Sequence, residues 1–232
     1  MPTQELLTSL VTQDSYATLS LRVAELVREQ IRKKPDSRLG LPTGRTPTGT
    51  YAALSQWTKQ GHLNWERVKA FGLDEYYDVD ESVSFRRYLQ TNLYSNINMP
   101  DDSRFSPIFN DDYDGVIAAH GGLDLTILGI GQNGHIAFNE PGTALDSWTH
   151  SIWLTESTLQ ANAEFFKGRF PTNAVTMGIQ TILGSKKVIL MASGQNKKEI
   201  LAKALRGPIT PDVPASFLQM HKDVTVMTDF QY

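Results

Sequence analysis

Two acidic residues and a histidine follow runs of apolar residues, where a folded chain can present side chains to a ligand. Asp74 and Glu75 follow VKAFGL (68–73), and His135 follows LDLTILGIG (123–131) and a glycine-rich turn. A carboxylate half buried at the end of a strand can have a raised pKa and serve as a general base. An imidazole titrates near neutrality and can move protons. The open alternatives are a solvated acidic turn and a structural histidine.

The turn before His135 reads GIGQNG, which matches the G-x-G-x-x-G pattern of dinucleotide-binding loops. That pattern requires a helix that begins at its third glycine and an acidic residue about 20 residues further on. Here only HIAFNE separates Gly134 from Pro141, which is too short for a crossover helix. The glycines are therefore expected to let the backbone turn sharply and approach a small ligand. Asn133 and Glu140 flank the histidine, and a carboxylate can orient an imidazole for proton transfer.

Two further loops have features of phosphate sites. PTGRTPTG can cap a helix with Thr46 and place Pro47 at its first position. The free N–H groups of a helix start can hold a phosphate together with nearby hydroxyls, and Arg45 favours this interpretation over a plain turn. SGQNKK repeats the design after a later apolar run, where Lys197 or Lys198 would supply a cation. A surface lysine is the alternative there.

Helical and strand-like segments alternate along the chain and define the elements that must position these loops. Helices are expected at 14–33, 47–60, 84–94, 111–121, 156–166 and 195–207, and strands at 38–43, 68–73, 123–131, 149–154, 186–193 and 224–229. This alternation predicts an α/β fold with a mainly parallel sheet covered on both faces. Such sheets bind ligands beyond the carboxyl ends of their strands, so the loops should converge on one crevice. No linker interrupts the pattern, and residues 1–232 are expected to form one domain.

Composition narrows the classes of function. The 232 residues have a net charge of −3, which argues against nucleic acid as a partner. The absence of cysteine excludes disulfides, thiolate metal sites and cysteine nucleophiles, and it suits a reducing cytoplasm. The histidines are scattered, so no metal site is expected. The polar N-terminus is unlike a signal peptide, and no apolar stretch approaches the roughly 20 residues of a membrane span, so we expect no membrane partner.

Four stretches together resemble glucosamine-6-phosphate deaminases, a family that shares its fold with 6-phosphogluconolactonases. They are LGLPTGRTPTGTYAAL, FGLDEYY, LGIGQNGHIAFNEPGT and PASFLQMH, and the likeness extends in order over about 15–229. The resemblance implies a modified Rossmann-like three-layer α/β/α sandwich. It also implies conversion of glucosamine 6-phosphate and water to fructose 6-phosphate and ammonia, without a metal or redox cofactor.

The resemblance assigns catalytic roles to four residues. Asp74 matches the carboxylate that removes the C2 proton of the ring-opened sugar and returns a proton at C1, which leaves an imine for water to hydrolyse. His135 matches the group that moves a proton during ring opening, and Glu140 and Asn133 match its partners. Members carry aspartate or asparagine at the position of Asn133. Because an amide cannot stabilise an imidazolium by charge, Glu140 is expected to do so.

The resemblance also places the phosphate on the 43–46 loop, with Lys197 as its later cation. The expected phosphate-binding residues are Thr43, Gly44, Arg45, Thr46 and Lys197. The chain departs from the family at ANAEFF, where Glu164 replaces a phosphate-binding arginine. At 4 Å a carboxylate would repel phosphate by about 1–4 kcal/mol. Either Glu164 points away, or Arg45, Lys167 or Arg169 replaces the missing cation. The chain ends soon after 229, which favours a monomer or a small homo-oligomer.

Three alternatives remain at this stage. Glu164 and PASFLQMH resemble enzymes acting on galactosamine 6-phosphate as much as those acting on the glucosamine compound. A 6-phosphogluconolactonase would keep the glycine-rich turn before His135 but not the FNEP continuation. A sugar-responsive regulator would add a DNA-binding module, and no helix-turn-helix fits outside 15–229.

Overall fold

A seven-stranded sheet forms the centre of the molecule. The computed structural model describes residues 8–156, 158–159 and 171–232. The strands are β1 (Thr8–Thr12), β2 (Arg38–Leu41), β3 (Lys69–Gly72), β5 (Arg104–Phe105), β6 (Leu125–Gly129), β9 (Val188–Ala192) and β10 (Val224–Thr228). Their order is β1-β10-β9-β6-β2-β3-β5, and every neighbouring pair is parallel. The expected mainly parallel sheet is confirmed.

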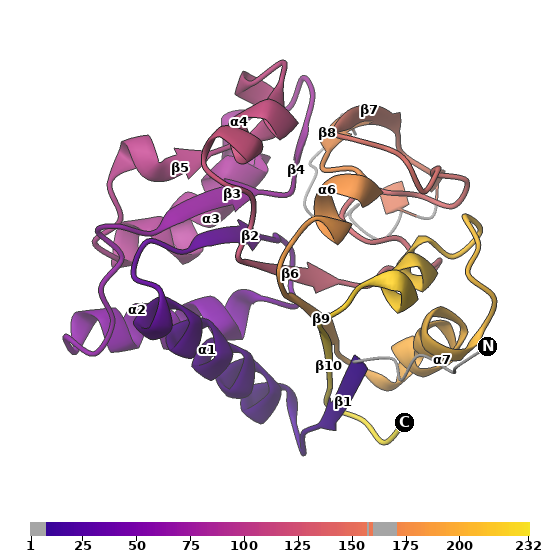
Figure 1. The fold of residues 1–232 in the computed structure, drawn as a ribbon, viewed down its shortest axis with the longest axis horizontal. Coiled ribbons are helices and arrows are strands. Elements are labelled where there is room, and N and C mark those ends of the chain that lie inside the picture. The colour runs from indigo at the N-terminus through magenta and orange to yellow at the C-terminus, as the bar shows by residue number, and fades with distance from the viewer. Residues whose placement is uncertain (1–7, 157, 160–170) are drawn as a thin grey trace.

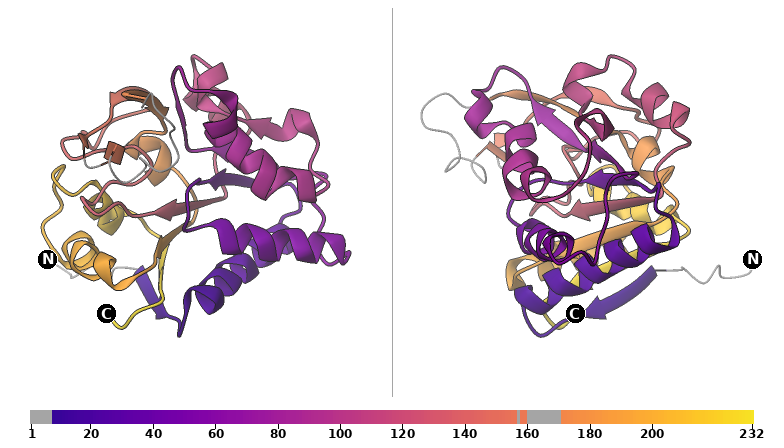
Figure 2. Two further views of the ribbon diagram at one scale, coloured as in Figure 1. Left: turned by 180° about the vertical axis from the view of Figure 1, so that it is seen from behind. Right: turned by 90° about the vertical axis from the view of Figure 1, so that its left-hand side faces the viewer.

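Helices cover both faces of this sheet (Figures 1 and 2). They are α1 (Tyr16–Lys33), α2 (Thr48–Lys59), α3 (Phe85–Asn92), α4 (Tyr113–Ala119), α6 (Ile179–Leu183) and α7 (Lys198–Arg206). Successive residues of β9 separate two apolar cores, because side chains alternate across a strand. Ile189 packs with α1 and α2, whereas Leu190 packs with α4, α6, α7 and the 3-10 segment Pro214–Met220. This arrangement is the expected three-layer α/β/α sandwich.

Local sequence accounts for the first helix and corrects the start of the second. In α1 the buried Leu19, Val23 and Val27 recur every fourth residue, and Ser15 forms a capping box with Thr18. The expected Thr46 cap does not form. Instead, α2 begins at Thr48 after Pro47 as N-cap, without a side-chain capping bond. The first N–H groups of α2 have other partners: that of Thr48 donates to the carbonyl of Arg45 at 3.3 Å, and that of Gly49 donates to the hydroxyl of Tyr16 at 2.9 Å.

A second, three-stranded sheet was not predicted. It has the order β4-β8-β7 and is antiparallel, with β4 (Asp74–Tyr76), β7 (His150–Trp153) and β8 (Asn173–Thr176). The sequence predicts an acidic loop from Asp74 onward, yet this stretch pairs with β8 through Asp74 and Thr176. The sequence analysis also missed β1, β8 and α6, which are short and stabilised by distant partners. Most of the helix expected at 156–166 lies outside the described residues.

Candidate active site

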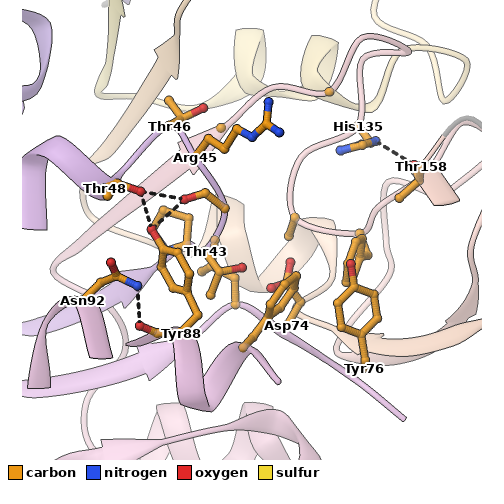
Figure 3. Close-up of a pocket in the computed structure, with 18 of the residues that line it drawn as sticks. Thr43, Arg45, Thr46, Thr48, Asp74, Tyr76, Tyr88, Asn92, His135 and Thr158 are labelled. Atoms are coloured by element: carbon orange, nitrogen blue, oxygen red, sulfur yellow. Dashed lines mark hydrogen bonds between the residues drawn. The ribbon is translucent and has the colours of Figure 1, made fainter. Parts of the chain in front are cut away.

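A cavity of about 780 Å³ lies beyond the carboxyl ends of β2, β3 and β6. It is lined by all but one of the predicted site residues, namely Thr43, Gly44, Arg45, Thr46, Asp74, Asn133, His135 and Lys197. The exception, Glu140, is only 2% exposed and contacts His135 from outside the cavity. Figure 3 shows Asp74 and His135 projecting toward the same open space, with Arg45 on its other side. The predicted convergence of the strand-end loops is confirmed.

The strand β4 directs its two acidic residues to opposite sides. Asp74 and Tyr76 both line the cavity, as residues two apart on one strand should. Glu75 points the other way, and its carboxylate accepts the N–H groups of Phe85 at 2.8 Å and Arg86 at 2.9 Å. These bonds connect β4 to the start of α3. A structural role for Glu75 therefore fixes the direction in which Asp74 points.

The carboxyl group of Asp74 has few polar contacts. It is 9% exposed, and its Oδ1 atom has no hydrogen-bond partner among the residues described. Burial, with a smaller contribution from the neighbouring charge of Glu75, raises the pKa of Asp74 to about 8. A carboxyl group that titrates near neutrality can act as a general base on a bound ligand.

An aromatic wall stands beside Asp74, and the sequence analysis did not identify it. The rings of Tyr76 and Phe85 lie 4.6 Å apart between centroids, and Phe138 lies 5.2 Å from Tyr76 and 5.6 Å from Phe85. All three residues line the cavity. The wall limits the water around Asp74, consistent with its raised pKa. The sequence does contain a signal for Tyr76: it lies two residues after Asp74, and residues two apart on a strand share a face.

The glycine-rich turn fixes the position of His135. Gly134 has φ +89°, and the N–H of Gly131 donates to the carbonyl of His135 at 2.9 Å. A Cβ atom on Gly131 would lie only 2.4 Å from the imidazole ring. No helix begins at Gly134, where the chain instead makes a tight turn. The expected sharp turn is confirmed, and the glycines also allow the backbone to approach the imidazole closely.

The carboxylate of Glu140 accepts several hydrogen bonds. Its donors are Asn133 Nδ2 at 2.7 Å, Thr158 Oγ1 at 2.5 Å and Thr155 Oγ1 at 3.2 Å. His135 Nδ1 lies 3.6 Å from Oε2. Burial alone would raise the pKa of Glu140, but the hydrogen bond and charge of His135, with the bonds from Thr158 and Asn133, lower it. Glu140 is thus held as an anion behind the imidazole.

One end of the cavity has the features of a phosphate-binding site. It consists of the backbone of the 43–46 loop and of two cations, Arg45 and Lys197. Gly44 has φ +88°, and the N–H groups of Thr43, Gly44 and Thr46 donate to no other described residue. Lys197 donates through Nζ to the carbonyl of Ile130 at 2.8 Å, and burial lowers its pKa. Unpaired amides beside a lysine and an arginine form an anion-binding surface.

Several predicted residues lie elsewhere or remain untested. Lys198, the alternative to Lys197, does not line the cavity, whereas Arg87 of α3 does and was missed. Glu164, Lys167 and Arg169 lie outside the described residues. Within the described ranges, no three His, Asp or Glu residues are grouped to hold a metal ion. No helix there has both the length and the apolar character to cross a membrane.

Comparison with known proteins identifies relatives over nearly the whole chain. Residues 12–227 match the model of a family described as glucosamine-6-phosphate isomerases/6-phosphogluconolactonase. A glucosamine-6-phosphate deaminase of Lachnoclostridium phytofermentans is 44% identical over 234 residues, covering 96% of this chain and 99% of the relative. One of Clostridium acetobutylicum is 42% identical over 233 residues, covering 95% and 96%.

Solved structures show the same two groups. A monomeric glucosamine-6-phosphate deaminase matches with a TM-score of 0.91 at 39% identity, covering 95% of this chain and 96% of the other. The 6-phosphogluconolactonase of Thermotoga maritima matches with a TM-score of 0.73 at 24% identity, covering 95% and 98%. The second likeness shows a shared fold.

Proposed function

Because the chain belongs to the family of glucosamine-6-phosphate isomerases and 6-phosphogluconolactonases, we propose that it is a glucosamine-6-phosphate deaminase. It converts glucosamine 6-phosphate and water to fructose 6-phosphate and ammonia. The observation that carries this proposal is the shared cavity, in which Asp74 and His135 lie together and an anion-binding loop lies nearby. The deaminase relatives at 39–44% identity support the same activity.

In this proposal the phosphate occupies the Thr43–Thr46 loop and is neutralised by Arg45 and Lys197. Those residues line the cavity together with Asp74 and His135, so one ligand can span both ends. Positioning of this kind lets binding energy at the phosphate hold the reacting carbons in place. Relatives often have a phosphate-binding arginine where this chain has Glu164, which lies outside the described residues. Arg45, within the loop, is the residue proposed to supply that positive charge instead.

Ring opening is assigned to His135. Its Nδ1 atom lies beside Glu140 and Thr158, and the other ring nitrogen faces the cavity (Figure 3). A proton held on Nδ1 by the anionic Glu140 leaves Nε2 free to accept the proton of the C1 hydroxyl and pass it to the ring oxygen. Asn133 orients Glu140, as the 2.7 Å bond between them supports.

Isomerisation is assigned to Asp74. The C2 proton becomes acidic once the C1 aldehyde has formed, and Asp74 removes it while a proton of the C2 ammonium group passes to the C1 oxygen, which gives an enolamine. Return of a proton at C1 leaves an imine at C2, and water adds to this imine and expels ammonia. A carboxyl group with a pKa near 8 is a stronger base than an ordinary aspartate, which suits this step.

The test is ammonia release by the purified protein from glucosamine 6-phosphate, with galactosamine 6-phosphate in a parallel arm. Higher kcat/KM for the glucosamine compound supports the proposal. Preference for the galactosamine compound would change the substrate while keeping the chemistry. No ammonia from either, with hydrolysis of 6-phosphogluconolactone instead, would contradict it.

We also propose that residues 1–232 form one domain that acts in the cytoplasm as a monomer or small homo-oligomer. A family match over 12–227 supports the single domain, and a cysteine-free sequence supports a reducing compartment. The related structure described as monomeric supports a low oligomeric state. Light scattering on the purified protein gives the mass in solution, and cell fractionation gives the location.

A further inference from the structure

Tyrosine hydroxyl groups donate to carbonyls of residues 42–46, the loop to which the proposed function assigns the phosphate and which is called the phosphate loop below. Four of the five carbonyl oxygens from Pro42 to Thr46 accept a hydrogen bond from a tyrosine. Tyr51 of α2 donates to Pro42 at 2.6 Å, and Tyr88 of α3 donates to Gly44 at 2.6 Å. Tyr16 of α1 lies 3.0 Å from the Arg45 oxygen and 3.1 Å from the Thr46 oxygen. Three phenols from three helices thus converge on one loop.

Each carbonyl determines where the next amide points, because C=O and N–H lie on opposite sides of a trans peptide unit. Tyr51, by holding the carbonyl of residue 42, directs the N–H of Thr43. Tyr88 acts in the same way on the N–H of residue 45, and Tyr16 on that of Thr46. The amides of Thr43 and Thr46 are among those that donate to no described residue. The tyrosines therefore orient the groups that a phosphate would accept from.

The contact at Gly44 is reinforced by a second hydroxyl. Thr48 Oγ1 lies 3.2 Å from the Gly44 oxygen and 2.9 Å from the hydroxyl of Tyr88, so the three groups form a closed triangle (Figure 3). Gly44 has φ +88°. Because the backbone of a glycine is free to rotate, an external contact is needed to hold it in one conformation. Burial raises the pKa of Tyr88 to about 12, against a smaller opposing effect of Thr48, so its phenol remains a donor at neutral pH.

Close packing brings Tyr16 to the loop. Its hydroxyl also accepts the N–H of Gly49 at 2.9 Å, at the start of α2. A Cβ atom on Gly49 would lie 2.5 Å from Ser20 Oγ and 3.3 Å from the ring of Tyr16. Helices α1 and α2 can therefore approach closely enough for the phenol to bridge them. This gives Tyr16 a defined place although its side chain is partly exposed.

We propose that Tyr16, Tyr51 and Tyr88 are positioning residues of the phosphate subsite. They keep the loop carbonyls turned away from the bound anion and its amides turned toward it. Without these contacts the peptide units can rotate and present carbonyl oxygens, which repel phosphate. The inference rests on the phosphate role given to this loop under the proposed function. It makes the affinity of the loop amides for phosphate depend on three phenols that act through the loop carbonyls.

The test measures binding of inorganic phosphate by calorimetry to the wild type, Tyr16→Phe, Tyr88→Phe and the double variant. Each substitution removes one hydroxyl and keeps the ring, and each should weaken phosphate binding by about fivefold, a factor typical of one lost hydrogen bond. Tyr113→Phe is the matched control, since Tyr113 is buried and donates to the carbonyl of Gly72 at 2.9 Å, outside the loop. The control should bind phosphate as the wild type does.

Kinetics with glucosamine 6-phosphate distinguish a positioning role of these tyrosines from a general loss of stability or activity. The loop variants should raise KM with little change in kcat, and their thermal unfolding should resemble that of Tyr113→Phe. Unchanged phosphate affinity in the double variant, or a wild type that binds no phosphate, would overturn the inference. Phosphate binding is measured without turnover. A protein that releases no ammonia would therefore refute the proposed function but would not affect the inference about phosphate affinity.

Discussion

Asp74 and Glu140 are both buried carboxyl groups beside the same cavity, yet their surroundings have opposite effects. Asp74 is 9% exposed with one oxygen lacking a partner among the described residues, and burial raises its pKa to about 8. Glu140 is 2% exposed, and hydrogen bonds with the nearby His135 lower its pKa. The more deeply buried group is the one held as an anion.

The difference shows that hydrogen-bond donors, more than burial, decide the charge state of a carboxyl group here. Burial beside the aromatic wall of Tyr76, Phe85 and Phe138 keeps the proton affinity of Asp74 high, which suits a base that must take a proton and return it. Asn133 and two threonine hydroxyls keep Glu140 charged, which suits a group that orients His135. Two identical functional groups thus receive two different tasks.

The largest effect is expected from Asp74→Asn. The amide has the same shape but cannot accept the C2 proton, so kcat should fall by about 10³-fold while inorganic phosphate binds as before. Asp78→Asn is the control, because it makes the same chemical change outside the cavity lining and asparagine tolerates the φ of +52° found there. Retained turnover in Asp74→Asn would remove Asp74 from the role of base.

The same variant should be more stable than the wild type at alkaline pH. Because the folded pKa of Asp74 is raised, its contribution to the free energy of unfolding is fully present below about pH 4 and is lost as the pH rises through 8. Asp74→Asn avoids that loss and should gain about 3–5 kcal/mol at pH 9. Urea unfolding at pH 5, 7 and 9 measures the difference, and a gap that does not grow with pH would contradict the assigned environment.

Glu140→Gln should change stability in the opposite direction. The folded pKa of Glu140 is lowered, so its contribution is present above the unfolded value and is lost as the pH falls through the folded value. At pH 7 the variant should lose about 1–3 kcal/mol, since a charged acceptor with several donors is replaced by a neutral one. The deficit should shrink toward pH 3 in the same urea experiment. A variant as stable as the wild type at pH 7 would show that the network does not favour the anion.

The smallest effect is expected at the phosphate end, away from both carboxyl groups. Arg45→Ala should raise KM by about fivefold to tenfold with kcat nearly unchanged, because it removes a cation from the loop and leaves the reacting groups in place. Initial rates at varied glucosamine 6-phosphate measure the split. An unchanged KM would point to Lys167 or Arg169 as the replacement cation.

Much of the site could be predicted because parallel strands end at the same edge. The loops after β2, β3, β6 and β9 contain residues whose types suggest chemistry, and strand order brings Asp74, His135 and Lys197 to one cavity. The glycine-rich turn was also interpretable, since the distance from Gly134 to Pro141 left no room for a helix. Local sequence was enough for these features.

What could not be predicted depends on partners far apart in the chain. The strand character of Asp74–Tyr76 arises from pairing with β8, about a hundred residues later, and the stretch NAVT has no periodic signal of its own. Thr158 reaches Glu140, and Tyr16 reaches Arg45, only in the folded molecule. A hydroxyl's contact with a distant carboxylate or carbonyl leaves no pattern in the surrounding sequence.

The contrast between the two carboxyl groups can be measured directly by a carbon-13 NMR titration of the side-chain carboxyl carbons, with Asp74→Asn and Glu140→Gln used to assign the two signals. The account predicts that the Asp74 signal moves with a midpoint near pH 8, whereas the Glu140 signal shows an anion throughout the range above its ordinary pKa. A fully ionised Asp74 at pH 6, or equal midpoints for the two groups, would contradict it.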